Sequence, residues 1–170
     1  GGRLAERVVR HTRVPVLVVR PSPEGIVLAA TDFSDPALPA LNAGAMEAHR
    51  RNLPLVILHA SDVLPVSGAP ELPMTAGALA ALEEVRRQQQ DRLDATAREL
   101  ERHHAVPTRT ELAEGPPARA ILERARVSPA SLVVVGTHGR TGLARLALGS
   151  TAEEVIHRAP CSVLVVRLRS

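Results

Sequence analysis

A glycine-rich segment with basic and hydroxyl side chains follows the apolar run "SLVVV" near the carboxyl end of the chain. The segment, "GTHGRTGLARLALGST", spans residues 136–151 and contains the spacing Gly136-x2-Gly139-x9-Gly149-Ser150. Glycines let a backbone turn with positive φ and approach a ligand closely. Backbone N–H groups at the start of a helix favour an anion. The segment therefore predicts a binding loop for an anion such as a phosphate.

A purely structural interpretation of the same segment stays open. In that alternative the glycines make a turn, and Ser150 caps the next helix through the capping box Ser150-x-x-Glu153. Two other phosphate motifs do not fit, since the segment has no Gly-x4-Gly-Lys-Ser/Thr and lacks the first Gly-x-Gly of a dinucleotide fingerprint. We expect His138 to be a bystander, because no Ser-His-Asp or paired-carboxylate arrangement accompanies it.

A second polar segment, "TDFSDPA", follows an apolar run near the start of the chain and covers residues 31–37. Asp32 offers a carboxylate directly after this expected strand. It has two possible roles, since it can accept a hydrogen bond from a ligand or cap the helix that follows.

Apolar periodicity divides the chain into alternating strands and helices. Short apolar runs bounded by turn residues predict strands, and apolar residues at helical spacing predict helices. The alternation implies right-handed βαβ units, hence an open α/β sheet with helices on both faces. The strands are expected at 25–35, 53–63, 106–115 (an edge), 131–136 and 162–167, and the helices at 36–52, 78–104, 116–128 and 150–158, with a loop at 64–77.

The composition fits a helix-covered domain and argues against several kinds of partner. The chain has 170 residues, of which 45% are hydrophobic and 23% charged, with a net charge of +3. We expect no nucleic-acid binding, because one aromatic residue, Phe33, provides no stacking platform. No stretch reaches the roughly 18 apolar residues of a membrane span, so we expect a cytoplasmic protein. The single cysteine, Cys161, is expected to be a buried and unreactive thiol.

The first twenty residues repeat the end of the chain. Residues 5–20, "AERVVRHTRVPVLVVR", align without gaps to residues 152–167, "AEEVIHRAPCSVLVVR", at a shift of 147 positions. We therefore predict that residues 1–21 are a helix–strand remnant of a preceding copy and that residues 22–170 form the domain itself.

The glycine spacing, "TDFSDPA" and the terminal "VLVV" together resemble the universal stress protein family. The resemblance covers residues 25–168, and the glycine spacing is similar to the ATP-binding signature of that family. It implies a five-stranded parallel sheet of order 3-2-1-4-5, the adenine nucleotide alpha hydrolase-like fold. In that order the strands before Asp32 and before the glycine-rich segment are neighbours whose following loops diverge. Both segments then meet at a topological switch point, where open α/β sheets bind ligands.

The resemblance also implies roles for single residues in an adenine nucleotide site. Asp32 accepts from a ribose hydroxyl, and the backbone at Ala60 meets the adenine. Arg140 either pairs with a phosphate or is solvated. The phosphates are expected on the backbone N–H groups and hydroxyls of the glycine-rich segment, contributed by Gly136, Thr137, His138, Gly139, Gly149, Ser150 and Thr151.

ATP is therefore expected as a regulatory ligand of a stress-response protein. Hydrolysis would be slow at most, because no positioned general base is visible in the sequence. Glu153 and Glu154 repel anions at the start of the last helix, and a bound Mg²⁺ or Mn²⁺ would relieve this. Two alternatives remain: an interaction module with a vestigial nucleotide site, and a nucleotide hydrolase or transferase on the same fold.

The resemblance further implies that final strands pair antiparallel across a dimer or tandem interface. Residues 14–20 copy such a final strand, and the edge at 162–167 is apolar and lacks a partner within the domain. We predict that residues 14–20 add antiparallel to this edge, within the chain or by exchange with a second chain. A homo-oligomer through the final and the N-terminal strands is the expected assembly.

Overall fold

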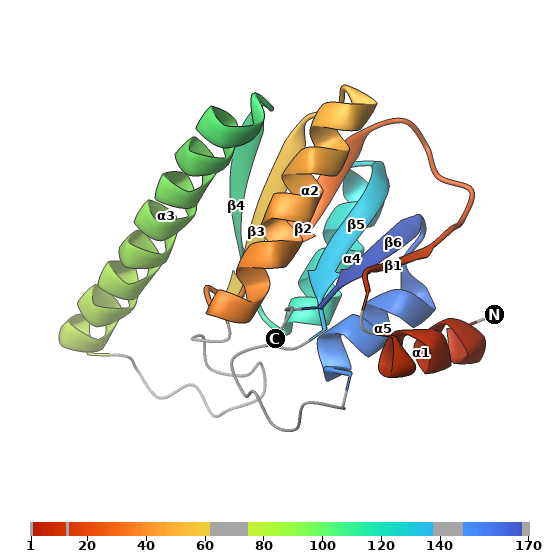
Figure 1. Cartoon of the computed structure of the whole chain (residues 1–170). Helices are drawn as coiled ribbons and strands as arrows, with labels where there is room; N and C mark the ends of the chain where they lie inside the picture. The colour runs from red at the N-terminus through yellow and green to blue at the C-terminus, as the bar shows by residue number, and fades with distance from the viewer. Residues whose placement is uncertain (1, 13, 62–74, 138–147, 168–170) are drawn as a thin grey trace.

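The molecule consists of a central sheet between two layers of helices (Figure 1). The computed structural model describes residues 2–12, 14–61, 75–137 and 148–167. The helices are α1 (Gly2–His11), α2 (Leu38–Arg51), α3 (Ala76–His104), α4 (Pro117–Val127) and α5 (Ser150–Arg158), and a 3-10 turn, η1 (Asp35–Ala37), precedes α2. The strands are β1 (Val16–Val18), β2 (Ile26–Ala30), β3 (Leu55–Ser61), β4 (Thr108–Glu114), β5 (Ala130–Gly136) and β6 (Ser162–Val166).

The expected strands and helices are all present, although their ends differ in places. β2 ends at Ala30, earlier than the expected end at residue 35, because the chain turns sharply at Phe33. Most of the expected loop at 64–77 lies outside the described residues. In the part of the chain that the structure describes, no helix is both long and apolar enough to cross a membrane.

Five parallel strands follow the order that the family resemblance implied. The sheet order is β1-β6-β5-β2-β3-β4, and the five strands from β6 to β4 are parallel. β2 is central, since Leu28 is paired with Val56 of β3 on one side and with Val133 of β5 on the other. β4 forms an edge, as predicted. The expected count of five is corrected to six, because β1 adds an antiparallel strand to β6.

Helices cover both faces of the sheet and bury an aliphatic core. Leu28 packs with residues of α1, α4 and α5, whereas its neighbours Val27 and Ala29 pack with residues of α2 and α3. The alternation follows from the two-residue period of a strand. All three side chains are fully buried. A sheet buried on both faces explains why its central strands are unbroken apolar runs in the sequence.

The helix that follows β2 approaches the sheet closely at Gly44. A Cβ atom at this position would lie 2.9 Å from the Cβ of Ala29, closer than real Cβ contacts. Glycine thus lets α2 pack directly against the central strand, which fixes where the turn between β2 and α2 can lie.

The N-terminal helix and strand are related to α5 and β6 by a local pseudo-two-fold axis. The 147-residue shift carries Leu17 onto Leu164, and these two residues are paired with each other in the ladder. The same shift interchanges the pairs on either side, Val16 with Val165 and Val18 with Val163. A pairing in which equivalent residues exchange partners is the signature of a two-fold interface.

Side-chain contacts repeat this symmetry outside the ladder. Arg20 donates to the carbonyl oxygen of Ile156, and its equivalent Arg167 donates to that of Val9, the equivalent of Ile156, at 3.4 Å. In Figure 1 the N-terminal segment lies beside α5 and β6. The prediction that residues 14–20 add antiparallel to the final strand is confirmed, and the strand pairs within the chain.

Candidate functional site

The carboxyl ends of β2 and β5 lie next to each other where the chain leaves them for opposite faces. These strands are parallel neighbours, and they lead into α2 and α5, which cover the two different faces. This arrangement is the topological switch point of an open α/β sheet, the usual place for a ligand. The structure therefore places the segment around Asp32 and the start of the glycine-rich segment together at the carboxyl ends of the strands.

The two carboxylate oxygens of Asp32 have different surroundings. Oδ1 accepts from the backbone N–H of Ser34 at 3.0 Å and from its hydroxyl at 2.5 Å. Oδ2 is buried and has no hydrogen-bond partner among the described residues. A buried polar atom is normally paired, so an orphan of this kind calls for a donor. One oxygen thus stabilises the turn through Ser34 and does not cap η1 or α2, whose N-caps are Ser34 and Ala37 without side-chain cap bonds, and the other oxygen has no described partner.

Phe33 holds the turn that carries Asp32, and the sequence analysis missed this role. Its φ of 63° lies in the left-handed region, which bulky residues rarely adopt. Its N–H donates to Thr31 Oγ1 at 3.0 Å, and its carbonyl accepts from Arg92 at 2.7 Å. Its ring centroid lies 4.1 Å from that of His59 and 4.7 Å from the guanidinium carbon of Arg92. The available signal was that the single aromatic residue of the chain directly follows Asp32.

His59 and Ala60 lie near the end of β3, at the same edge of the sheet. His59 is 4% exposed, and its Nδ1 donates to the carbonyl oxygen of Thr31 at 2.9 Å. This bond joins the end of β3 to the end of β2, so His59 has a packing role. Ala60 is half-buried and is paired with Ala113 of β4. Its position near the end of β3 is consistent with the backbone role that the resemblance implied.

The base of the glycine-rich segment is closed by two backbone hydrogen bonds. Thr137 N–H donates to the carbonyl oxygen of Val166 at 3.0 Å, and Thr137 O accepts from Gly149 N–H at 2.8 Å. Leu148 packs into the core immediately before α5. Both ends of the segment are therefore fixed to the sheet. The predicted site residues His138, Gly139 and Arg140 lie outside the described residues.

These contacts correct one expectation about the segment and show which of its N–H groups donate within the fold. The capping box is wrong, because Gly149 is the N-cap of α5 and Ser150 is its first helical residue. The bond to Thr137 holds Gly149 extended, with ψ of 145°, so the helix begins only at the next residue. The N–H groups of Thr137 and Gly149 also donate within the fold, and Gly136 is paired with Val166 in the sheet.

The start of α5 still offers donors. The N–H groups of the first three helical residues have no partner within a helix. Ser150 is exposed and Thr151 half-buried, so both hydroxyls face accessible space. Glu153 is paired with Arg10 at 3.1 Å, and Glu154 with Arg158. These arginines offset the anion repulsion for which Mg²⁺ or Mn²⁺ was expected.

A protein-family model matches most of this chain. The model of the "Universal stress protein family" matches residues 25–167. The chain belongs to the universal stress protein family. The matched range begins just before β2, so it leaves α1 and β1 outside the family domain.

Curated universal stress proteins are similar over different lengths. One from Methanocaldococcus jannaschii is 33% identical over 141 residues, which cover 83% of this chain and 81% of that protein. One from Mycobacterium tuberculosis is 32% identical over 176 residues, which cover 98% of this chain and 56% of that protein. The chain thus spans about half the length of the mycobacterial relative and matches it through the N-terminal segment as well.

Solved universal stress proteins share the fold. Universal stress protein UspA from Lactobacillus plantarum matches with a TM-score of 0.72 at 27% identity, covering 86% of this chain and all of that one. A universal stress protein in complex with cAMP matches with a TM-score of 0.58 at 26% identity, covering 85% of this chain and 98% of that one. The fold of this chain is therefore that of universal stress proteins, some of which bind adenine nucleotides.

Proposed function

We propose that this universal stress protein domain binds ATP as a regulatory ligand at the ends of β2 and β5. The observation that carries the proposal is the buried Oδ2 of Asp32 at the switch point of the sheet, which has no hydrogen-bond partner among the described residues. An oxygen of this kind is suited to accept from a ribose hydroxyl, as acidic residues do in other nucleotide-binding α/β folds. The proposal includes the cytoplasmic location that the sequence predicts.

The first turn of α5 is suited to bind the phosphates of the nucleotide. Unpaired N–H groups and the positive end of a helix dipole attract phosphate, and the hydroxyls of Ser150 and Thr151 add two donors. The universal stress protein in complex with cAMP supports an adenine nucleotide as the ligand class. The glycine spacing of residues 136–150 favours ATP within that class.

Hydrolysis of the bound nucleotide is expected to be slow at most. His59 is the imidazole that the described residues place near Asp32, and its Nδ1 donates to the carbonyl of Thr31. This imidazole is only 4% exposed, so an attacking water has little access to it as a base. The domain therefore acts as a nucleotide-binding module in our proposal, and not as an efficient enzyme.

Calorimetry on Asp32→Asn tests the proposal, with ATP and inorganic triphosphate as the two ligands. The variant keeps the size of the side chain but removes the charge and one acceptor. Losing one charge-assisted hydrogen bond of about 1.5–3 kcal/mol should lower ATP affinity about ten-fold or more. Triphosphate affinity should stay the same, because Asp32 serves the ribose.

Asp35→Asn is the matched control, since Asp35 lies three residues further along the same segment and is exposed. It should leave both affinities unchanged. A folded wild-type chain that binds no ATP would instead favour the vestigial-site alternative. Equal losses for both ligands in Asp32→Asn would remove the ribose role.

We also propose that α1 and β1 form an interface with a preceding copy of the domain. Several apolar side chains in or beside these elements are exposed, although their equivalents in or beside α5 and β6 are buried. Val14 is 62% exposed and Val19 75%, whereas their equivalents Cys161 and Val166 are 0% and 5% exposed. In the domain, β5 and α4 help to cover the equivalent positions. A preceding copy would cover the exposed residues in the same way.

The position of the unpaired sheet edge limits how this chain can pair with another copy of the domain. The edge of β6, expected as a contact between copies, is occupied by β1. The outer edge of β1 is free. Because β1 is equivalent to β6, which pairs with β5, we propose that the β5-equivalent strand of the preceding copy pairs there. The relative from M. tuberculosis supports this, because it matches 98% of this chain with 56% of its own length. The alternative is a homo-oligomer in which two copies of this chain pair through the same edge, and light scattering of the chain measures its mass.

A further inference from the structure

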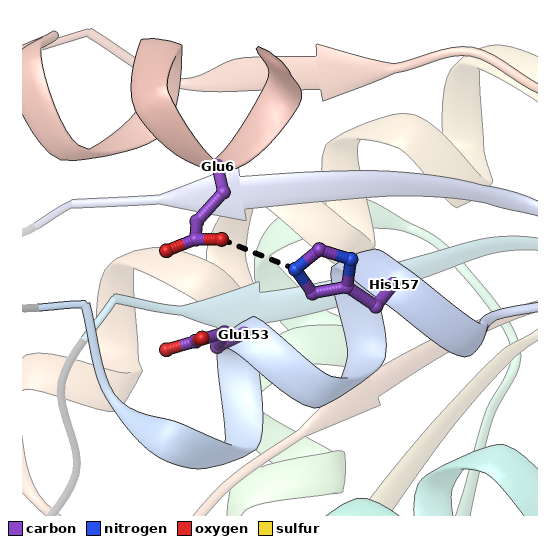
Figure 2. Close-up of side chains that lie close together, drawn as sticks. All are labelled: Glu6, Glu153 and His157. Atoms are coloured by element: carbon purple, nitrogen blue, oxygen red, sulfur yellow. Dashed lines mark hydrogen bonds and ion pairs between the residues drawn. The ribbon is translucent and has the colours of Figure 1, made fainter. Parts of the chain in front are cut away.

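Three potential metal ligands from two helices lie together on the face opposite α2. Glu6 comes from α1, and Glu153 and His157 come from α5. One ligand atom from each lies within 4.8 Å of the other two. Figure 2 shows Glu6 pointing from α1 toward His157, with Glu153 one helical turn before it. Glu153 and His157 are four residues apart, which places them on one face of α5.

The pseudo-two-fold axis relates the residues of this cluster to one another in pairs. Glu6 and Glu153 are equivalent, and Arg10 is equivalent to His157. The contacts Glu6–His157 and Arg10–Glu153, both 3.1 Å, therefore exchange under the symmetry. Arginine at both basic positions would give ion pairs alone, because a guanidinium has no lone pair for a metal. Histidine at position 157 adds an imidazole, the commonest metal ligand.

The two carboxylates already hold a cation. The guanidinium of Arg10 lies 2.7 Å from Glu6 and 3.1 Å from Glu153. Hydrogen bonds from Arg10 and then from His157 hold the pKa of the Glu6 carboxyl below its usual value, so Glu6 is ionised at neutral pH. The four side chains are between 19% and 40% exposed, which lets water and a hydrated ion reach them. Arg10 is itself one-third exposed and can move into solvent.

We propose that Glu6, Glu153 and His157 bind a zinc ion, which displaces Arg10 and takes water as its fourth ligand. Zinc accepts mixed nitrogen and oxygen ligands in tetrahedral geometry at about 2.0–2.2 Å, which separates neighbouring ligand atoms by about 3.4 Å. The Glu6–His157 separation of 3.1 Å is close to this value, and the remaining separations need only side-chain rotation. Ca²⁺ and Mg²⁺ prefer all-oxygen sites and should bind more weakly.

The ion would join the N-terminal segment to the domain. Its ligands come from α1 and α5, and α1 lies outside the matched family range. Ligands spread over two elements make metal binding stabilise the docked arrangement. Zinc is thus expected to raise the melting temperature of the chain. The inference does not depend on nucleotide binding.

Calorimetric titration with ZnCl₂ tests the site on the tag-free 170-residue chain. Wild type should bind one zinc ion. In Glu6→Gln and in His157→Gln the affinity for this ion should be about ten-fold or more lower. His103→Gln is the matched control, because it removes an exposed imidazole from α3, far from the cluster in sequence and on a different helix. It should leave this binding event unchanged. Far-UV circular dichroism checks that each variant is folded.

Arg10→Ala separates a metal site from a simple ion-pair network. Removing the competing cation should tighten zinc binding several-fold, and zinc should restore the melting temperature that the lost ion pairs lower. An ion-pair network alone predicts the same loss of stability with no response to zinc. No zinc binding by wild type, undiminished binding by the two ligand variants, or weaker binding by Arg10→Ala would each overturn the site.

Discussion

At the scale of the residue, the turn after β2 shows how local strain can serve a site. Phe33 adopts a left-handed conformation that costs an ordinary L-residue about 1–2 kcal/mol. The contact between its ring and that of His59 contributes about 0.5–1.5 kcal/mol, and the guanidinium of Arg92 adds about 0.5–1 kcal/mol. These contacts offset the strain. They hold Asp32 with one oxygen committed to the turn and the other unpartnered.

Cys161 gives a prediction at this scale. Its side chain is buried, and burial raises the pKa of the thiol above its usual value of 9.0, although Arg20 and a hydrogen bond from the backbone of Val133 lower it. A raised pKa means less thiolate at any given pH, and the thiolate is the reactive form. The native chain should therefore resist an aromatic disulfide reagent at mildly alkaline pH, and the urea-unfolded chain should react fully. Rapid reaction of the native chain would show that the thiol is accessible.

At the scale of the element, the position of the site depends on how closely α2 packs against β2. The turn with Asp32 is short, so a shift of α2 would move it. Gly44 sets the distance between this helix and the sheet, with Ala29, Leu55 and Val134 around the missing Cβ. β5 and α5 are fixed in a similar way, by the bond between Thr137 and Gly149. The Asp32 turn and the start of α5 are therefore both positioned by elements packed on the sheet.

Gly44→Val should destabilise the fold. The new side chain would meet the Cβ of Ala29 at 2.9 Å, with Leu55 3.5 Å and Val134 3.7 Å away on the buried side. Overpacking of this kind costs about 1–3 kcal/mol, which urea unfolding followed by circular dichroism measures. Gly77→Val is the matched control, because the nearest atom to a Cβ there is Thr75 Oγ1 at 4.0 Å. An equal loss of stability in both variants would contradict the packing argument.

At the scale of the whole molecule, the N-terminal segment covers the edge of β6 and leaves several of its own apolar side chains exposed. β1 covers the edge of β6, and α1 packs beside α5. Several apolar residues of this segment are nevertheless exposed, namely Leu4, Val8, Val14, Leu17 and Val19. Exposed apolar residues that gather on one segment mark an interaction surface.

Replacing Val14 and Val19 together with Ser should reduce self-association of the chain. These side chains flank β1 and would contact another copy when no preceding domain covers them. Light scattering after size exclusion, over a range of protein concentrations, measures the change. Met46→Ser is the control, because Met46 is 61% exposed on α2 and lies outside this segment. Its mass should match that of wild type.

Deletion of residues 1–21 tests the other side of the same segment. It frees the edge of β6, which carries the apolar residues Val163 and Val165. The truncated chain should melt at a lower temperature and associate through that edge. An unchanged mass and melting temperature in the truncated chain would show that β1 has no structural role.

The sequence by itself determined the elements, their order along the chain and the family. Short apolar runs bounded by turn residues favour strands buried on both faces, and their alternation with amphipathic helices leaves few topologies. The repeat of residues 5–20 at 152–167, together with the family resemblance, predicted an antiparallel strand on the last edge. Asp32 and the glycine spacing were also recognisable, since both follow predicted strands.

Only the tertiary structure decided how the atoms of these segments are used. The sequence could not show that the N–H groups of Thr137 and Gly149 are consumed by the fold, because their acceptors are brought near by strand pairing and loop closure. The left-handed turn at Phe33 depends on His59 and Arg92, which come from two other elements. The cluster of Glu6, Glu153 and His157 exists only because β1 docks on β6. Contacts between residues distant in sequence arise from packing, and no local pattern encodes them.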